Sequence, residues 1–315
     1  MTARDPSSEP SARRIGRPRS LSALMWERFL EHRLAVTSLA VLALLVGLAA
    51  AGPLIEAAMG LDASAVDLFN RFQPPSWTHL LGTDELGRDL FLRLLYGGRI
   101  SLFAGLVAAL VSAVIGTVFG LLAGFYGGRL DAFVMRFTDG VIALPLLPLL
   151  IVLAAVDLTK VGLPDWITQS EEASLYRIIL IITLVGWTTV ARLVRAATLS
   201  IREREFVLAA RAQGAGPVRI MAVHILPNVV SPIIVATTLS VGGIILLESV
   251  LSFLGLGIQP PTPSWGNMLT GALELIWTAP HLVYYPGLLI FVTVIAFNFL
   301  GDGLQDAFDP KAVYR

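Results

Sequence analysis

The chain alternates between long apolar runs and shorter polar connections, and the lengths of the runs indicate the fold class. A helix needs roughly 20 apolar residues to cross the hydrocarbon core of a bilayer. Six runs approach or exceed that length, although the third and fourth need 133–138 and 173–176 to complete them. They are Leu34–Ile55, Ile100–Tyr126, Gly140–Val156, Ile178–Ala191, Ile225–Leu247 and Leu282–Gly301. The pattern predicts an all-α membrane protein with six transmembrane helices.

The positions of arginine predict how these helices are oriented. Six crossings place both chain ends on one side, together with the 127–136 connection and the arginine-rich 192–219 stretch. The opposite side holds 253–281, which contains no lysine or arginine, and 157–172, where acidic residues outnumber a single lysine. Segments rich in lysine and arginine stay in the cytoplasm, so we expect both termini to be cytoplasmic. The arginines of 56–99 are an exception, but acidic residues are interleaved with them.

The composition agrees with lipid as the main solvent. Of the 315 residues, 55% are hydrophobic and 15% charged, whereas a soluble domain usually carries about 25% charged residues. The formal net charge of zero argues against nucleic-acid binding. The absence of cysteine excludes disulfides, thiolate metal sites and thiol catalysis.

These features divide the chain into four expected parts. A basic tail rich in proline and serine, 1–27, has the composition of a disordered cytoplasmic arm. Residues 28–98 contain the first transmembrane helix, too long for the apolar region of a signal peptide, and an extracytoplasmic segment. Residues 99–302 contain the other five helices, and 303–315 form a cytoplasmic C-terminal tail.

Small residues and prolines mark two of the predicted helices. The second run carries a stripe with four-residue spacing: Ser112, Gly116, Gly120 and Gly124. Such a stripe lets another helix approach closely, and the partner is either a helix of this chain or a second subunit. In the third run, Pro145 and Pro148 each remove a backbone donor and predict a kink.

The connection between the fourth and fifth runs predicts a helix–turn–helix projection. Glu205–Gln213 contains helix formers and no breaker. Gly214 and Gly216 permit a turn with positive φ, and Pro217 suits the first position of a second helix. We expect that second helix to end near His224, before the fifth span.

The projection has small side chains at Ala209, Ala210 and Gly214, and the neighbouring positions carry charged residues. Periodicity alone leaves two interpretations. One is an ordinary amphipathic loop helix, and the other is a surface that docks into a groove on a partner protein.

Isolated polar residues give weaker signals. Glu248 follows more than twenty uncharged residues, and a carboxylate at membrane depth is costly unless it is paired or wet. It either lies near a transport pathway or has reached the outer interface. The acidic and basic residues of 84–89 predict an ion-paired turn that starts a helix, with Asp84 or Thr83 as its cap. The four histidines are scattered, so we expect no metal site.

The chain lacks the motifs of catalysis. No G-x-x-x-x-G-K-[ST] loop occurs, and no glycine is followed by lysine, so ATP would have to be bound by another chain. No H-E-x-x-H motif occurs either. We expect no catalytic residue and no cofactor in this chain.

The residues of the projection resemble a known element. Ala209-Ala210-x-x-x-Gly214, followed by His224-x-Leu226-Pro227, is similar to the EAA loop of ABC importer permeases. Two positions depart from the motif: Leu208 replaces its leading glutamate, and His224 replaces the usual isoleucine.

Further segments resemble the oligopeptide/dipeptide branch of these permeases. Leu81–Asp89 is similar to its LGTDxxGRD signature, and Leu251–Gly257 with Pro260–Gly266 resembles its loop after the fifth span. Gly301–Leu304 resembles its C-terminal region. The extra N-terminal helix looks like that of the C-type permease.

The resemblance implies a type I ABC importer permease fold in the cell membrane. It implies four partner subunits besides the lipid bilayer, and no nucleic acid: a homologous B-type permease, two cytoplasmic ATPases and an extracytoplasmic solute-binding protein. The cargo would be a di- or oligopeptide, although nickel chelates, glutathione and some sugars use the same branch. The implied ATPase-coupling residues are Glu205, Ala209, Ala210, Gly214, Ala215, Pro217, His224, Leu226 and Pro227.

Two other classes of membrane protein agree less well with the sequence. A secondary transporter would carry its own coupling-ion site and repeated halves, and no such repeat is evident. A membrane-embedded enzyme would need catalytic groups that converge at one depth, and the sequence contains only isolated acids.

Overall fold

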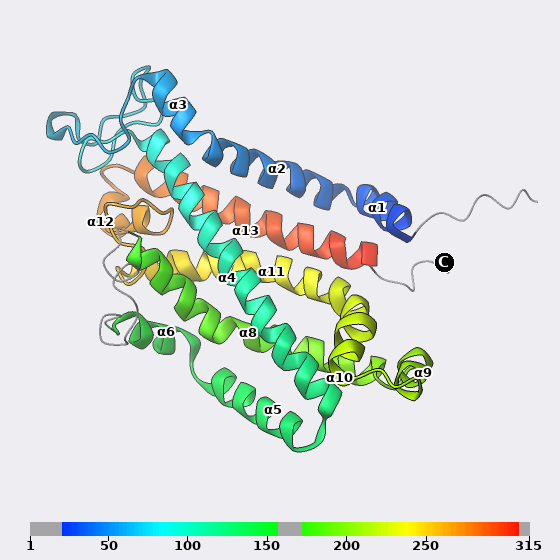
Figure 1. Ribbon diagram of the computed structural model, residues 1–315. Helices are drawn as coiled ribbons and strands as arrows, with labels where there is room; N and C mark the ends of the chain where they lie inside the picture. Colours follow the sequence, from blue (N-terminus) through cyan, green and yellow to red (C-terminus); the bar gives the residue numbers. More distant parts are fainter. Residues whose placement is uncertain (1–20, 157–171, 309–315) are drawn as a thin grey trace, which may run out of the picture.

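The computed structural model describes residues 21–156 and 172–308. They form a bundle of helices (Figure 1), and the only β-pairing among them is an isolated bridge between Thr83 and Asp89. Most of the expected N-terminal tail, nearly all of the 157–172 connection and the last residues of the C-terminal tail lie outside the described residues.

The helices follow one another with few long connections. In chain order they are α1 (Leu21–Glu31), α2 (Arg33–Ala50), α3 (Gly52–Met59), the 3-10 turn η1 (Leu68–Asn70), α4 (Leu90–Tyr126), α5 (Gly128–Ala143), α6 (Leu146–Ala154), α8 (Ala173–Ile201), α9 (Glu205–Ala212), α10 (Pro217–Arg219), the π-helical turn η3 (Ile220–Ile225), α11 (Leu226–Phe253), the 3-10 turn η4 (Asn267–Leu269), α12 (Ala272–Leu275) and α13 (His281–Phe308).

The predicted membrane-spanning helices are confirmed. Five units of the described chain are long and apolar enough to cross a bilayer: α2, α4, α8, the continuous unit from α10 to α11, and α13. The pair α5 and α6 passes the same test only as a unit bent by 88°. The expected number of six therefore holds if this bent pair is one span.

The bend explains the predicted kink. Leu144 leaves the helix with φ −75° and ψ 139°, because the ring of a proline disfavours helical backbone in the residue before it. Pro145 then stands as the N-cap of α6, whereas Pro148 lies inside α6 without interrupting it. The kink is thus made by Pro145 alone.

Several helices extend beyond the predicted ends. The expected 127–136 connection is the first half of α5, and α8 continues through Arg192 as far as Ile201. Both predictions were wrong because they ended the helices at charged residues. The Arg195 guanidinium forms an ion pair with Asp131, so the charges join the two helices and do not end them.

The expected tails are also partly helical. Helix α1 begins at Leu21 and α13 ends at Phe308, so each reaches into a segment that was expected to be a tail. Helix α4 begins at Leu90, so the helix start expected after the 84–89 turn and the apolar run that begins at Ile100 belong to one helix. In each case, polar residues continue a helix beyond its apolar run.

The small stripe of α4 packs against α8 of the same chain. A Cβ atom on Gly116 would lie 2.6 Å from the Trp187 carbonyl oxygen, and one on Gly120 would lie 2.7 Å from the Ala191 carbonyl oxygen. Only glycine allows the two backbones to come this close. Of the two interpretations of the stripe, packing within the bundle is the one observed.

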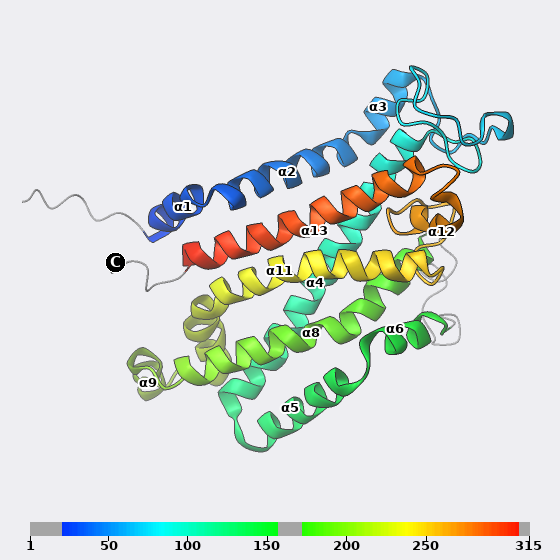
Figure 2. The same ribbon diagram turned by 180° about the vertical axis from the view of Figure 1, so that it is seen from behind.

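The two ends of the bundle differ in what they carry. Helix α9, helix α1 and the last turn of α13 lie at one end in both views (Figures 1 and 2). Helix α3, the connection that leads to α4, and α12 lie at the other. Both ends of the described chain are therefore on the same side of the bundle.

Candidate functional site

The projection between α8 and α11 has the predicted helix–turn–helix form. Helix α9 begins at Glu205 and ends in a Schellman motif, in which Gly214 has a φ of +85°. The Gly214 N–H donates to the Arg211 carbonyl at 3.0 Å, and the Ala215 N–H donates to the Ala210 carbonyl at 3.0 Å. These bonds satisfy carbonyl groups that the end of the helix would otherwise leave unpaired.

The second half of the projection differs from its prediction. Gly216 has a φ of −71°, so Gly214 alone makes the turn. Pro217 starts the next helix as expected, but that helix does not end at His224. It passes through a π-helical turn, in which the Leu226 N–H bonds to the Met221 carbonyl five residues back, and continues as α11.

The inner face of α9 is anchored to the bundle. Val207 is 0% exposed, and it packs with Ile220 and Ile225 against residues of α4 and α8. The Arg202 guanidinium donates to the Gly124 carbonyl at the end of α4, at 2.9 Å. The buried side of α9 therefore shares one apolar cluster with residues of α4, α8, η3 and α11.

The outer face of the projection is open and partly apolar. Val218 is 74% exposed, and Phe206 and Leu208 are each nearly half exposed. Sequence analysis did not identify these three residues as a surface, although an exposed apolar side chain on a polar connection is itself a sign of a partner surface.

The structure brings the predicted coupling residues together but on different faces. Ala210 is buried; Ala215, His224 and Leu226 are intermediate; and Glu205, Ala209, Gly214, Pro217 and Pro227 are exposed. Ala210 therefore belongs to the anchor and not to the small-sided outer surface that was expected.

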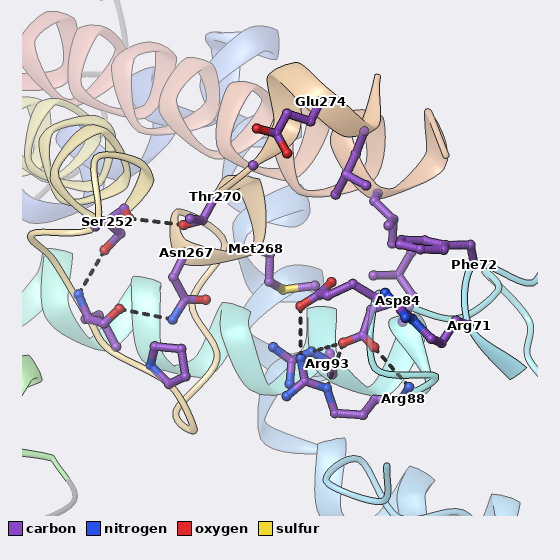
Figure 3. A pocket seen from close by; sticks show the side chains of 18 of the residues that line it. Arg71, Phe72, Asp84, Arg88, Arg93, Ser252, Asn267, Met268, Thr270 and Glu274 are labelled. Atoms are coloured by element: carbon purple, nitrogen blue, oxygen red, sulfur yellow. Dashed lines mark hydrogen bonds and ion pairs between the residues drawn. The ribbon is translucent and has the colours of Figure 1, made fainter. Parts of the chain in front are cut away.

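The opposite end of the bundle carries the predicted ion-paired turn (Figure 3). The Arg88 Nε donates to the Asp84 carboxylate at 2.7 Å, and the Arg93 Nε approaches the same carboxylate oxygen at 3.1 Å. The Asp89 carboxylate caps α4 by accepting from the Leu92 N–H at 2.8 Å. The ion-paired turn and the helix start are confirmed, but the cap is Asp89 and not Asp84 or Thr83, because the Asp84 carboxylate faces the two arginines.

A cavity of about 540 Å³ lies beside this turn. Its walls come from the turn and from the connection after α11 (Figure 3). Three arginines and three acids line it: Arg71, Arg88, Arg93, Asp84, Glu85 and Glu274. Because the opposite charges are balanced, the cavity suits polar contacts with a zwitterionic or mixed surface.

Glu248 is enclosed by hydroxyl groups. Its side chain is 0% exposed, and its carboxylate accepts hydrogen bonds from Ser252 at 2.7 Å and from Ser101 at 3.3 Å. A pathway role requires an accessible carboxylate, and this conformation provides none. The observed role is to join α11 to α4.

The described residues contain no group of three or more acidic, histidine or cysteine side chains placed to hold a metal ion. Two of the histidines instead serve local structure. His32 accepts from the Ala35 N–H at the start of α2, and His79 contacts Asp89 at 3.0 Å.

Comparison with known proteins identifies the family. The model of binding-protein-dependent transport system inner membrane components matches residues 116–314. The model of the N-terminal transmembrane domain of oligopeptide transport permease C matches residues 20–75, which contain α1, α2 and α3. The chain belongs to this family of transport permeases.

Individual relatives match nearly the whole permease. It is 37% identical over 310 residues to the oligopeptide transport system permease protein OppC of Bacillus subtilis, and the match covers 96% of each chain. It is 42% identical over 287 residues to the dipeptide transport system permease protein DppC of the same organism, covering 91% of this chain and 84% of that protein. A DppC of Haemophilus influenzae is 39% identical over 244 residues, or 76% of this chain and 78% of that protein.

These matches confirm the resemblance drawn from the motifs, including the C-type assignment. The permease is a multi-pass membrane protein, and the relatives are permease components of transport systems.

Proposed function

We propose that the permease is one of two membrane-spanning subunits of an ATP-driven importer of di- and oligopeptides in the cytoplasmic membrane. The observation that carries the proposal is the match over 96% of both chains to an oligopeptide transport permease. Its partners are a homologous B-type permease, two cytoplasmic ATPases and an extracytoplasmic solute-binding protein. The permease itself performs no covalent chemistry.

In this proposal, α9 is the coupling helix. Its exposed face, with Phe206, Leu208 and Val218 nearby, docks into a groove on an ATPase. Its buried face rests on α4, α8 and α11 through Val207 and its neighbours. Closure of the ATPase dimer would move α9, and the close packing of its anchor would pass the movement to the membrane-spanning helices. The permease pair would then alternate between outward and inward openings.

This assignment sets the orientation of the bundle. The end with α9 and both described chain ends is cytoplasmic, and the end with α3 and α12 is extracytoplasmic. The arginine asymmetry of the connections supports the same orientation. The four-part division of the chain stays a prediction, and its boundaries fall within α1, α4 and α13.

The extracytoplasmic end offers a surface for the binding protein. Phe69, Trp77 and Trp277 are almost fully exposed there, and the charged cavity lies between the connections that carry them. Exposed aromatic side chains beside balanced charges are typical of protein–protein interfaces. We place the docking surface of the binding protein on these connections.

Reconstitution tests the proposal. The permease pair, its ATPases and the binding protein are placed in liposomes, and uptake of a labelled tripeptide is measured with and without ATP. We expect ATP-dependent uptake that is lost when any one component is omitted, and no ATP hydrolysis by this permease alone. Hydrolysis by the purified permease, or uptake driven by an ion gradient without ATP, would contradict the proposal.

A second measurement addresses the cargo. The cognate binding protein is screened against peptides, nickel chelates, glutathione and sugars by calorimetry. Tight binding of short peptides supports the proposed substrate class. Preference for another class of ligand would contradict peptides as the substrate but not the assignment as an ATP-driven importer.

A further inference from the structure

An ion pair between α5 and α8 lies half exposed on the surface of the bundle. The Arg192 Nη2 lies 2.6 Å from the Asp139 Oδ1, and the two side chains are 47% and 56% exposed. A neighbouring pair, Arg195 with Asp131, is more buried, at 31% and 17% exposed. That second pair engages both carboxylate oxygens of Asp131, whereas the first uses one oxygen and one nitrogen.

The position of Arg192 along α8 places it at membrane depth. Arg177 donates to the Gly257 carbonyl in the extracytoplasmic connection after α11, at 3.5 Å, so this end of α8 is at the surface. Arg192 follows fifteen residues later, which is about 22 Å along a helix. The hydrocarbon core is about 30 Å thick, so Arg192 lies within it.

Lipid is not a suitable environment for this pair. An exposed charge in the hydrocarbon core is costly, and charged groups of membrane-spanning helices face water-filled cavities or other protein. Helix α5 is consistent with such a cavity, because Arg129, Asp131, Arg136 and Asp139 lie along its sixteen residues. Helices α5 and α6 form one edge of the bundle in both views (Figures 1 and 2). No other helix of the described chain covers this edge, so a water-filled route can run along it.

We infer that the Asp139–Arg192 pair lines the route of the transported peptide and binds its charged ends. This inference rests on the proposed function of peptide import. The amino end of a peptide would contact Asp139, and its carboxylate would contact Arg192. Because the pair makes a single hydrogen bond, the second Asp139 oxygen and most of the guanidinium N–H groups remain for such a ligand.

The same two helices also make an aromatic contact. The rings of Phe137 and Trp187 stack with centroids 6.0 Å apart; Trp187 is buried, whereas Phe137 remains largely exposed. An exposed aromatic ring accepts apolar side chains of many shapes. The pair would hold the ends that all linear peptides share, and Phe137 would contact side chains that differ.

Uptake by charge-removing variants tests the inference in the reconstituted transporter. We expect Arg192→Gln and Asp139→Asn to lower the maximal rate of tripeptide uptake at least fivefold, with partner subunits and ATPases still bound. Loss of a half-exposed ion pair has little effect on stability, so assembly should survive. Arg33→Gln is the matched control, because it removes an exposed arginine from the first residue of α2, and we expect less than a twofold change.

Three outcomes would decide the question. Unchanged uptake by both variants would overturn the inference and leave the proposed function intact. Loss of the partner permease from the purified complex would make the pair an interface contact and would also overturn it. Absence of ATP-dependent uptake by the wild type would instead refute the proposed function.

Cysteine labelling provides a second measurement that does not depend on uptake. The chain has no cysteine, so an introduced thiol is the only one that this subunit can present. A Cβ atom at Gly140 meets nothing within 4 Å, which makes Gly140→Cys a suitable probe beside Asp139. Val114→Cys is the control, since Val114 is exposed on the side of α4 away from the glycine stripe.

We expect a charged, water-soluble thiosulfonate to label Gly140→Cys at least tenfold faster than Val114→Cys. A linear dipeptide at millimolar concentration should slow this labelling, whereas the cyclic dipeptide of the same composition, which lacks both charged ends, should not. Equal labelling at the two positions, or equal protection by the two peptides, would overturn the inference.

Discussion

The Ser101 hydroxyl lies 3.3 Å from the Glu248 carboxylate, and 147 positions separate the two residues in the chain. The same hydroxyl accepts a hydrogen bond from the backbone N–H of Trp265 at 3.1 Å. One serine therefore connects α4, α11 and the connection that follows α11. Since Glu248 is fully buried, this network holds together the end of the bundle that carries α12.

The first prediction concerns that network. Glu248→Ala removes the acceptor of Ser101 and Ser252 and leaves a cavity, so we expect a loss of about 2–4 kcal/mol in stability. Glu248→Gln keeps the volume, and serine hydroxyls can donate or accept, so the loss should be below about 1 kcal/mol. The measurement is the thermal unfolding midpoint in detergent, with the exposed Glu31→Ala as control. Equal midpoints for Glu248→Ala and Glu31→Ala would contradict the assigned role.

The second prediction concerns coupling. Gly214→Asp adds a side chain at a φ of +85°, which costs roughly 1 kcal/mol, and it places a charge on the surface proposed to dock on the ATPase. We expect normal insertion but at least a tenfold loss of transport, through weaker ATPase binding or uncoupled hydrolysis. The measurement is uptake together with co-purification of the ATPases from the same membranes.

Its matched control is Gly128→Asp, at the turn between α4 and α5 and outside the projection. Gly128 also has a positive φ, and a Cβ atom there also meets nothing within 4 Å. The backbone cost is therefore similar, while neither the projection nor the connections proposed to contact the binding protein are changed. If Gly214→Asp transports as well as Gly128→Asp with ATPases bound, the projection around α9 is not the coupling element.

The third prediction concerns the contact between α4 and α8. A side chain on Gly120 would collide with the Ala191 carbonyl and with Val194, so Gly120→Leu should destabilise the permease by about 1–3 kcal/mol. Gly47→Leu in α2 is the control, because a Cβ atom at Gly47 meets nothing within 4 Å. Purification yield and thermal midpoint are the measurements. Equal stability of the two variants would show that the close approach of α4 and α8 is not required.

The fourth prediction concerns topology. We expect reporter fusions at both chain ends, and in the projection after Gln213, to be active only as cytoplasmic reporters. Fusions in the 61–66 connection or after Trp277 should behave as extracytoplasmic reporters. A result with the two chain ends on opposite sides would contradict the six-span arrangement and the proposed orientation.

The sequence alone determined the class and the main elements of this permease. The lengths of the apolar runs predicted the membrane-spanning helices, because the thickness of a bilayer fixes the number of apolar residues that a span requires. Local backbone preferences predicted α9 and the turn at Gly214, and Pro145 predicted the bend between α5 and α6. These features depend on residues that are close in the chain.

Tertiary structure alone decided which distant residues meet. Arg192 and Asp131 were predicted to lie in connections outside the spans, yet both are helical, because ion pairs between α5 and α8 compensate charges that would otherwise end a span. Glu248 left two interpretations open, and the serines of α4 and α11 enclose it in a third arrangement. The glycine stripe likewise gave no partner until α8 was placed against it. A hydropathy pattern assigns each residue type one average free energy of transfer from water to an apolar solvent. The free energy of a particular buried or membrane-embedded charge depends instead on the one or two groups that face it.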